Sequence, residues 1–93
     1  MDPLNPPRKK VTLEIPEYSR NFGIIHDWVD GYKIDVQLDS NEIIVSANKE
    51  GLITLALFLL QLAQDEVPSG NHGHFDAGRE LEDGSENLIL QKL

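Results

Sequence analysis

The stretch from Asn41 to Leu93 constrains the fold more than any other part of the chain. It begins with a short β-branched segment, continues into a segment that is apolar almost all round, and ends with two strand-like segments on either side of an acidic turn. Alternating polar and apolar residues predict strands, whereas an apolar surface that repeats every 3.6 residues predicts a helix. The order strand, helix, strand, strand is typical of an α+β domain.

Length and composition limit the chain to one small domain. Its 93 residues can bury one helix against one sheet and little more. Three prolines and the basic triplet Arg8-Lys9-Lys10 lie within the first ten residues. This composition predicts a flexible lead-in over residues 1–10 and a single domain over residues 11–93.

The compartment is expected to be the cytoplasm. The chain has no Cys, which excludes disulfides, thiolate metal sites and a Cys nucleophile, and fits a reducing environment. The N-terminus has no apolar segment behind its charges, as a secretory signal would have. The longest unbroken apolar run, residues 55–60, is much shorter than the roughly 20 residues that span a membrane. We therefore expect neither standard secretion nor membrane insertion.

The charge balance narrows the possible partners. The chain has 16 acidic residues and 8 basic ones, a formal net charge of −8. Such a protein repels phosphate backbones, so we expect no nucleic-acid partner, whereas a basic protein would be drawn toward it. The alternative interpretation is that the acidity only keeps a small domain soluble.

The first half of the chain has the pattern of an antiparallel meander. Alternation is clean in Val11–Ile15 and in residues 32–38, and it is broken by a bulge at Ile24-Ile25 within residues 21–29. Asp30-Gly31 predicts a type I′ hairpin turn, because Gly accepts positive φ without steric cost. A second turn at residues 39–41 leads into a strand over residues 42–47.

The middle of the chain predicts one long helix from about residue 49 to about residue 65. Asn48 is a good N-cap, and Glu50 suits the positive end of the helix dipole. At helical spacing the expected buried ridge is Leu52, Ala56, Leu59 and Ala63, and the polar stripe opposite is Glu50, Thr54, Gln61 and Asp65. Leu57 and Phe58 fall beside this polar stripe. We therefore expect both side chains to lie on the surface of the isolated domain. They would form a contact with a second copy or a partner, or the N-terminal tail would cover them.

Two more strands are predicted after the helix, over residues 72–75 and 86–90. The acidic loop between them contains one large apolar residue, Leu81, which is expected to pin the loop to the body. The predicted fold class is therefore α+β, an antiparallel β-sheet of about five strands with one long helix packed on one face. The element order would be β-β-β-β-α-β-β or one strand fewer.

Three side chains after the helix resemble a metal site. His72, His74 and Asp76 share one strand face, as in a site with two His and one carboxylate. Same-face neighbours lie about 7 Å apart, so the two His could share an ion, but Asp76 would lie about 13 Å from His72. A third ligand would have to come from elsewhere, so the alternative is a structural or partner-contacting His face.

Known enzyme signatures are missing from the chain. It has no Gly-rich phosphate loop, no G-x-S-x-G and no H-E-x-x-H. Glu80 and Glu82 could act as an acid/base pair in a cleft, but in a charged loop they are more often solvated. We expect no enzymatic activity, no catalytic residue and no cofactor. Trp28 is expected in the core or, alternatively, as an interface anchor.

Several short motifs, in a fixed order, carry a family resemblance. They are Ser46–Leu52, Leu62-Ala63-Gln64, Val67–Gly70, His72–Asp76 and Leu81–Ser85. Over residues 41–91 the chain resembles the immunity protein 32 family. The resemblance implies an α+β protein that binds and neutralises a cognate bacterial polymorphic toxin. Where the family pattern is often polar, this chain has Leu57 and Phe58, which implies a different toxin partner or a self-association surface.

The leading hypothesis is an inhibitory binding module that occludes a toxin. The expected contact residues are His72, His74, Asp76, Glu80 and Glu82, with Trp28 and Phe58 as anchors. One alternative is a small metal-binding, hydrolase-like protein that uses His72 and His74. Another is a homodimeric structural subunit that associates through Leu57 and Phe58.

Overall fold

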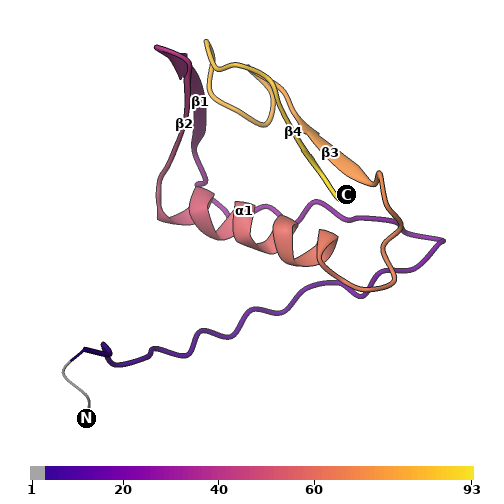
Figure 1. Cartoon of the computed structure of the whole chain (residues 1–93). Helices are drawn as coiled ribbons and strands as arrows, with labels where there is room; N and C mark the ends of the chain where they lie inside the picture. The colour runs from indigo at the N-terminus through magenta and orange to yellow at the C-terminus, as the bar shows by residue number, and fades with distance from the viewer. Residues whose placement is uncertain (1–3) are drawn as a thin grey trace.

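The computed structural model describes residues 4–93 and has an α+β fold, which confirms the predicted class. The elements are β1 (Ile34–Asp39), β2 (Glu42–Ala47), α1 (Lys49–Leu62), β3 (His72–Phe75) and β4 (Leu88–Gln91). In Figure 1 the β1–β2 hairpin rises from the N-terminal end of α1, and β3 and β4 run together on the other side of the molecule. The helix forms the base that joins the two hairpins.

The strands form two antiparallel pairs, not the single sheet of about five strands that was predicted. β1 pairs with β2, and β3 pairs with β4. The acidic loop forms hydrogen bonds along the edge of β1 that does not pair with β2. The Glu82 N–H donates to the Ile34 carbonyl at 2.9 Å, and the Glu86 N–H donates to the Val36 carbonyl at 2.7 Å. Loop backbone thus takes the place of a further strand between the two hairpins.

Both predicted turns form, but only one has the predicted type. Ser40 and Asn41 both have positive φ, 50° and 66°, which is the type I′ geometry of a two-residue hairpin. At the other turn the Tyr32 N–H donates to the Val29 carbonyl at 3.1 Å, and Gly31 has a φ of 81°. Positive φ at the second central position only is type II geometry, so the predicted type I′ turn is wrong there. This turn leads into β1 and joins no hairpin.

The two predicted strands before β1 do not form. Val11–Ile15 is extended without a ladder partner, and its first residue is exposed. A strand needs a neighbouring edge for its backbone groups, and alternation alone does not supply one. Figure 1 shows this segment as part of an N-terminal tail that lies apart from the helix. Residues 1–3 of the predicted lead-in lie outside the described part of the chain.

Residues 16–29 bond to side chains of α1 and of Gln64 just after it, and not to a strand. The Gln61 amide accepts from the Ile25 N–H at 3.1 Å and donates to the Ile25 carbonyl at 2.6 Å. The Val29 N–H donates to the Thr54 hydroxyl at 3.1 Å, and the Tyr18 N–H donates to the Gln64 amide at 3.0 Å. These side chains satisfy backbone groups that a sheet would otherwise satisfy, which explains why the predicted bulged strand is absent.

The helix begins as predicted and ends three residues early. The Asn48 side chain accepts from the Gly51 N–H at 2.8 Å, which confirms the N-cap. At the other end the Gln64 amide donates to the Gln61 carbonyl at 3.1 Å, and the Lys92 ammonium donates to the Gln64 carbonyl at 2.7 Å. The first bond satisfies a carbonyl of the last turn, and the second satisfies the carbonyl of a residue two positions beyond the end of α1 at Leu62.

The predicted orientation of the helix is wrong. Leu57 and Phe58 are only 9% and 3% exposed, whereas Leu52 and Leu59 of the predicted buried ridge are 56% and 50% exposed. The face that includes Thr54 and Gln61 turns inward because both side chains bond to residues 16–29. The predicted homodimer contact through Leu57 and Phe58 is therefore not on the surface, and Phe58 is not placed to anchor a partner.

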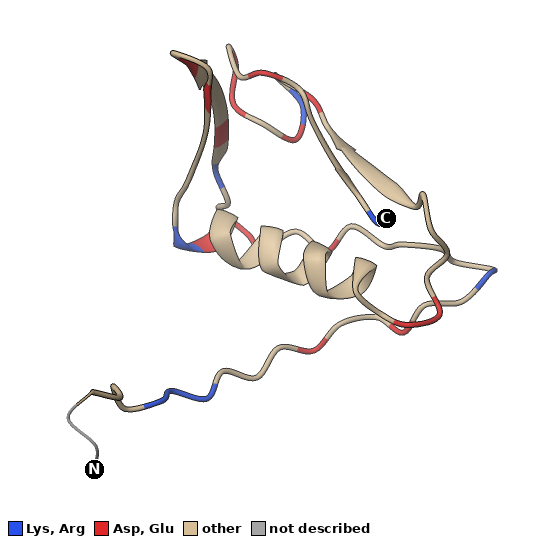
Figure 2. Cartoon of the chain, in the orientation of Figure 1, with Lys and Arg blue, Asp and Glu red and all other residues tan. Residues whose placement is uncertain are grey.

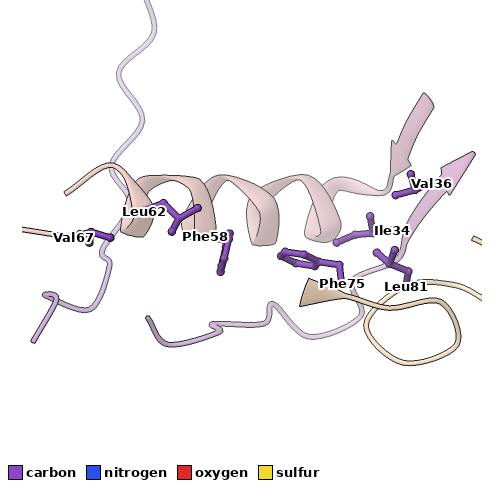
Figure 3. Packing of buried hydrophobic residues seen from close by; sticks show 7 residues of the cluster. All are labelled: Ile34, Val36, Phe58, Leu62, Val67, Phe75 and Leu81. Atoms are coloured by element: carbon purple, nitrogen blue, oxygen red, sulfur yellow. The ribbon is translucent and has the colours of Figure 1, made fainter. Parts of the chain in front are cut away.

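The core lies between the helix and the hairpins. Figure 3 shows Phe58 and Leu62 of α1 together with Phe75 of β3 and Ile34 of β1, and Leu81 reaches the same cluster from the acidic loop. The predicted pinning role of Leu81 is thus confirmed by its burial. Among residues 4–93, no helix is both long and apolar enough to cross a membrane.

Candidate functional site

The outer face of β3 presents the two predicted histidines. Strand alternation places His72 and His74 outward and buries Gly73 and Phe75. The two imidazole rings lie edge to face with centroids 5.0 Å apart. The Nδ1–H of His72 donates to the Gly70 carbonyl at 2.9 Å, because a carbonyl can only accept, and this leaves Nε2 of His72 free.

Gly73 lets the inner side of the same strand approach the helix. A Cβ at this position would overlap the ring of Phe58 and lie 3.1 Å from Nε2 of His26. The rings of Phe58 and Phe75 meet edge to face at 5.1 Å. The close approach of β3 to α1 therefore fixes the strand that carries the two exposed histidines.

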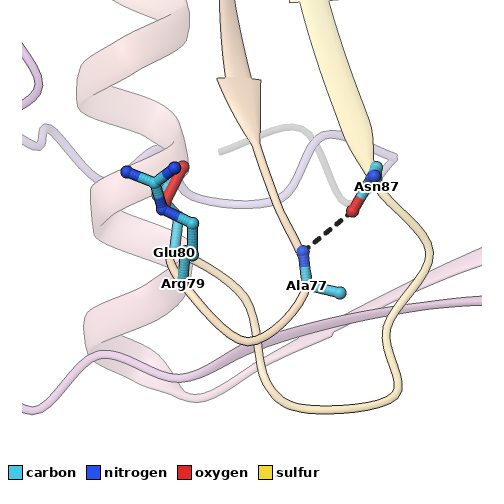
Figure 4. A network of polar contacts seen from close by, with 4 residues as sticks. All are labelled: Ala77, Arg79, Glu80 and Asn87. Atoms are coloured by element: carbon cyan, nitrogen blue, oxygen red, sulfur yellow. Dashed lines mark hydrogen bonds and ion pairs between the residues drawn. The ribbon is translucent and has the colours of Figure 1, made fainter.

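The acidic loop that follows β3 has a well-fixed backbone. The Asp76 carbonyl accepts from the N–H groups of Arg79 and Leu81 at 3.1 and 3.0 Å, and the Gly78 N–H donates to the Leu81 carbonyl at 3.0 Å. The Ala77 N–H donates to the Asn87 side chain at 2.9 Å, the bond drawn in Figure 4. With Leu81 buried beneath it, the loop presents its carboxylates from a defined conformation.

Ser85 ties the far end of the loop to β1. Its hydroxyl donates to the Asp35 carboxylate at 2.8 Å and accepts from the Val36 N–H at 3.2 Å. The Glu82 N–H also bonds to β1, as described above. The loop is therefore anchored at β3, at the core and at β1.

The charge of the loop is strongly negative. Its acids are Asp76, Glu80, Glu82, Asp83 and Glu86, and its one base is Arg79. Arg79 approaches Glu80 at 3.8 Å, but its own side chain is largely exposed, so the pair is worth little. Figure 2 shows these acids in red along the loop and the basic triplet in blue on the distant N-terminal tail.

Tyr32 joins this loop as a site residue that the sequence analysis did not single out. Tyr32 and residues 78–83 line an open hollow. Burial raises the pKa of the Tyr32 hydroxyl, and the negative charges of Glu80 and Glu82 raise it further. The only sequence signal was its place on the same strand face as Ile34, which predicts core and not a surface hollow.

An aromatic cluster supports the loop from inside. Trp28 stacks on Tyr32 with centroids 4.9 Å apart, and His26 lies 5.1 Å from Trp28 and 5.0 Å from Phe58. Trp28 is partly buried and packs against the core, which is one of the two expectations for it. Its other expected role, as a partner anchor, stays a prediction.

His26 sits where these groups meet. Burial lowers the pKa of its imidazole, and the Glu80 carboxylate opposes part of this effect. Glu80 lines the same hollow as Tyr32, which stacks on Trp28, whereas His72 and His74 face outward on β3. In the described part of the chain, no hydrogen bond, ion pair or ring contact joins either exposed histidine to Glu80 or Glu82. The predicted contact residues thus form two groups.

The described part of the chain supplies no third ligand for a metal site at His72 and His74. Within residues 4–93, no three His, Asp or Glu side chains are arranged to hold a metal ion. Asp76 follows β3, outside the strand that carries the two histidines. His72 and His74 alone do not make the three-ligand site that zinc hydrolysis uses.

Together, the fold and these surfaces define a small α+β domain with an anchored acidic loop. The family model for immunity protein 32 matches residues 42–93, which is more than half of the chain. The chain belongs to the immunity protein 32 family, and the resemblance noted from its motifs is confirmed. Comparisons with curated proteins and with solved structures gave no match.

Proposed function

We propose that this protein is an immunity protein that binds a cognate bacterial toxin and neutralises it by occlusion. The observation that carries the proposal is the match of the immunity protein 32 model to β2, α1, β3, β4 and the loops between them. All the expected contact residues except Trp28 lie within the matched region. The action is stoichiometric binding and needs no catalytic residue and no cofactor.

The acidic loop is the proposed primary contact. Its backbone is anchored at both ends, so little conformational entropy is lost when a partner binds. Its carboxylates, chiefly Glu80 and Glu82, would face a basic surface of the toxin, and Tyr32 offers an aromatic floor. The net charge of −8 would speed the encounter by electrostatic steering.

The histidine face is the proposed second contact. His72 and His74 stand outward on β3, and their neighbours across the ladder are Gln91 and Ile89. This small surface contains polar and apolar side chains. It is suited to form hydrogen bonds at the rim of an interface whose centre is the acidic loop. Because it is separate from the loop, the two contacts can be tested independently.

Binding kinetics with the purified toxin domain test the loop. The change is Glu80→Gln with Glu82→Gln, which keeps shape and removes two charges. We expect the association rate to fall about tenfold at low salt and less at high salt, because screening weakens steering. The toxin domain that we propose to purify for this test is the C-terminal region of the protein encoded beside this gene.

A matched control removes the same charge elsewhere. Glu14→Gln with Glu17→Gln makes an equal change on two exposed residues, one just before and one at the start of residues 16–29. We expect this pair to leave the association rate within about twofold of wild type. Equal loss in both double variants would contradict the loop as a contact. A parallel variant, His72→Ala with His74→Ala, tests the second contact by its dissociation rate.

A further inference from the structure

One edge of the β1–β2 hairpin has no partner. β1 is flanked by β2 on one side and by loop backbone from Glu82 and Glu86 on the other. The Asp39–Glu42 pair closes the two-residue turn, and bonding alternates along an antiparallel ladder. Ile43, Val45 and Ala47 therefore direct their N–H and C=O groups away from β1. Within residues 4–93, no hydrogen bond reaches this outer edge of β2.

The side chains of this edge are apolar and exposed on both faces. Ile43 is 71% exposed, Ile44 43% and Val45 42%. Edge strands are normally protected by Lys, Pro or a bulge, and β2 has none of these. Its one charged residue, Glu42, stands at its start. A six-residue edge with these features is a template for a further strand.

We propose that β2 pairs antiparallel with β2 of a second copy of this chain, about a twofold axis at Val45. In this register Val45 faces its own equivalent, Ile44 faces Ser46, and Ile43 faces Ala47. The outward N–H and C=O groups of both strands then meet, and β-branched side chains pair across the junction. The result is a continuous four-stranded sheet in the order β1-β2-β2-β1. This association does not depend on the proposed toxin binding.

Charge favours a second copy in this register. In this register Glu42 at the start of one strand faces Asn48 of the other chain, and Lys49, the first residue of α1, follows Asn48. The two Glu42 residues are separated by six strand positions, about 20 Å, which exceeds the screening length of about 8 Å. Each end of the junction thus pairs unlike charges, although the two chains carry the same net charge.

The size of the contact sets the expected affinity. A stable interface covers about 800 Å² on each partner, and a six-residue strand edge covers less. We therefore expect a reversible dimer with a dissociation constant of about 10–100 μM. The histidine face and the acidic loop belong to other elements, so each copy would keep both.

Sedimentation equilibrium of the full chain tests the proposal over about 1 μM to about 1 mM. The expected mass rises with concentration from 10.5 kDa toward twice that value. Val45→Lys places two like charges face to face at the axis and should weaken association at least tenfold. Far-UV circular dichroism checks that the variant is folded.

Leu59→Lys is the matched control, because it makes the same charge change on an exposed apolar residue of α1. We expect this variant to dimerise like wild type. Three results would overturn the proposal: a wild-type monomer at about 1 mM, a dimer that Leu59→Lys disrupts and Val45→Lys does not, or equal disruption by both.

A charge swap tests the register. Glu42→Lys and Lys49→Glu should each weaken the dimer severalfold, and the double variant should restore it, because unlike charges again meet at both ends. If the double variant dimerises no better than the single variants, the twofold register at Val45 is wrong.

Discussion

The buried side-chain amide of Gln61 makes the two backbone hydrogen bonds that the edge of a neighbouring strand would otherwise make. It accepts from the Ile25 N–H and donates to the Ile25 carbonyl, at 3.1 and 2.6 Å, and its side chain is almost fully buried. A Gln can do this because its amide both donates and accepts and has no charge to desolvate. Together with Thr54 and Gln64, it thereby holds residues 16–29 in place.

Replacing this amide should therefore destabilise the fold. Gln61→Leu keeps the volume and removes both bonds, so the free energy of unfolding should fall by about 1–3 kcal/mol. Urea unfolding measures the change. The control is Gln91→Leu on the exposed face of β4, where we expect less than about 0.5 kcal/mol. Equal losses in the two variants would contradict a bonding role for Gln61.

His26 should make the stability of the protein depend on pH. Burial lowers its pKa in the folded state, so the folded protein favours the neutral imidazole. Above about pH 6.5, the ordinary pKa of His, both states are neutral and His26 has no effect. As the pH falls below that value, the unfolded chain takes up the proton first. The free energy of unfolding should then decrease until the pH is below the folded pKa.

Unfolding free energies between pH 8 and pH 5, measured for wild type and for His26→Gln, test this effect. The decrease below about pH 6.5 should be smaller in the variant. His72→Gln with His74→Gln serves as control and should keep the wild-type profile. A wild-type slope in His26→Gln would show that other groups cause the dependence.

At the scale of elements, local signals were sufficient for the second half of the chain. The side chain of Asn48 predicted the helix start, and Asp39-Ser40-Asn41 predicted the β1–β2 turn, because caps and turns depend on neighbouring residues only. The strands after the helix were also expected, with β4 shifted by one or two residues.

Non-local contacts decided what the sequence could not predict. The helix is apolar almost all round, so periodicity alone could not choose its buried face. Thr54 and Gln61 turn inward because residues 16–29 lie against them. The same contacts removed the predicted strand over residues 21–29 and left Val11–Ile15 without an edge to pair with. Of the site, the exposed histidines followed from alternation, but Tyr32 beside the loop did not.

The orientation of α1 gives a direct prediction. Phe58→Ala removes a ring from the core and should lower the free energy of unfolding by about 3–5 kcal/mol. Leu59→Ala changes a half-exposed neighbour and should cost less than about 1 kcal/mol. Chemical denaturation of both variants measures the difference. A larger loss of unfolding free energy for Leu59→Ala than for Phe58→Ala would mean that α1 buries the face of Leu59, as helical periodicity alone predicted.

At the scale of the whole molecule, three surfaces are distributed over different elements. The outward histidines lie on β3 and the anchored acidic loop follows it, whereas the open β2 edge lies on the other hairpin. The core of Figure 3 joins them, because Phe75 of β3 and Ile34 of β1 share one cluster. This separation would allow the proposed toxin binding and the proposed self-association to occur on one small domain without competition.

The most direct test of the immunity function is growth. Cells express the C-terminal region of the protein encoded beside this gene, alone or together with this chain. The proposal predicts arrest in the first case and normal growth in the second, with weaker rescue by Glu80→Gln with Glu82→Gln than by wild type. Arrest that persists when the folded wild-type protein is co-expressed would contradict the immunity function.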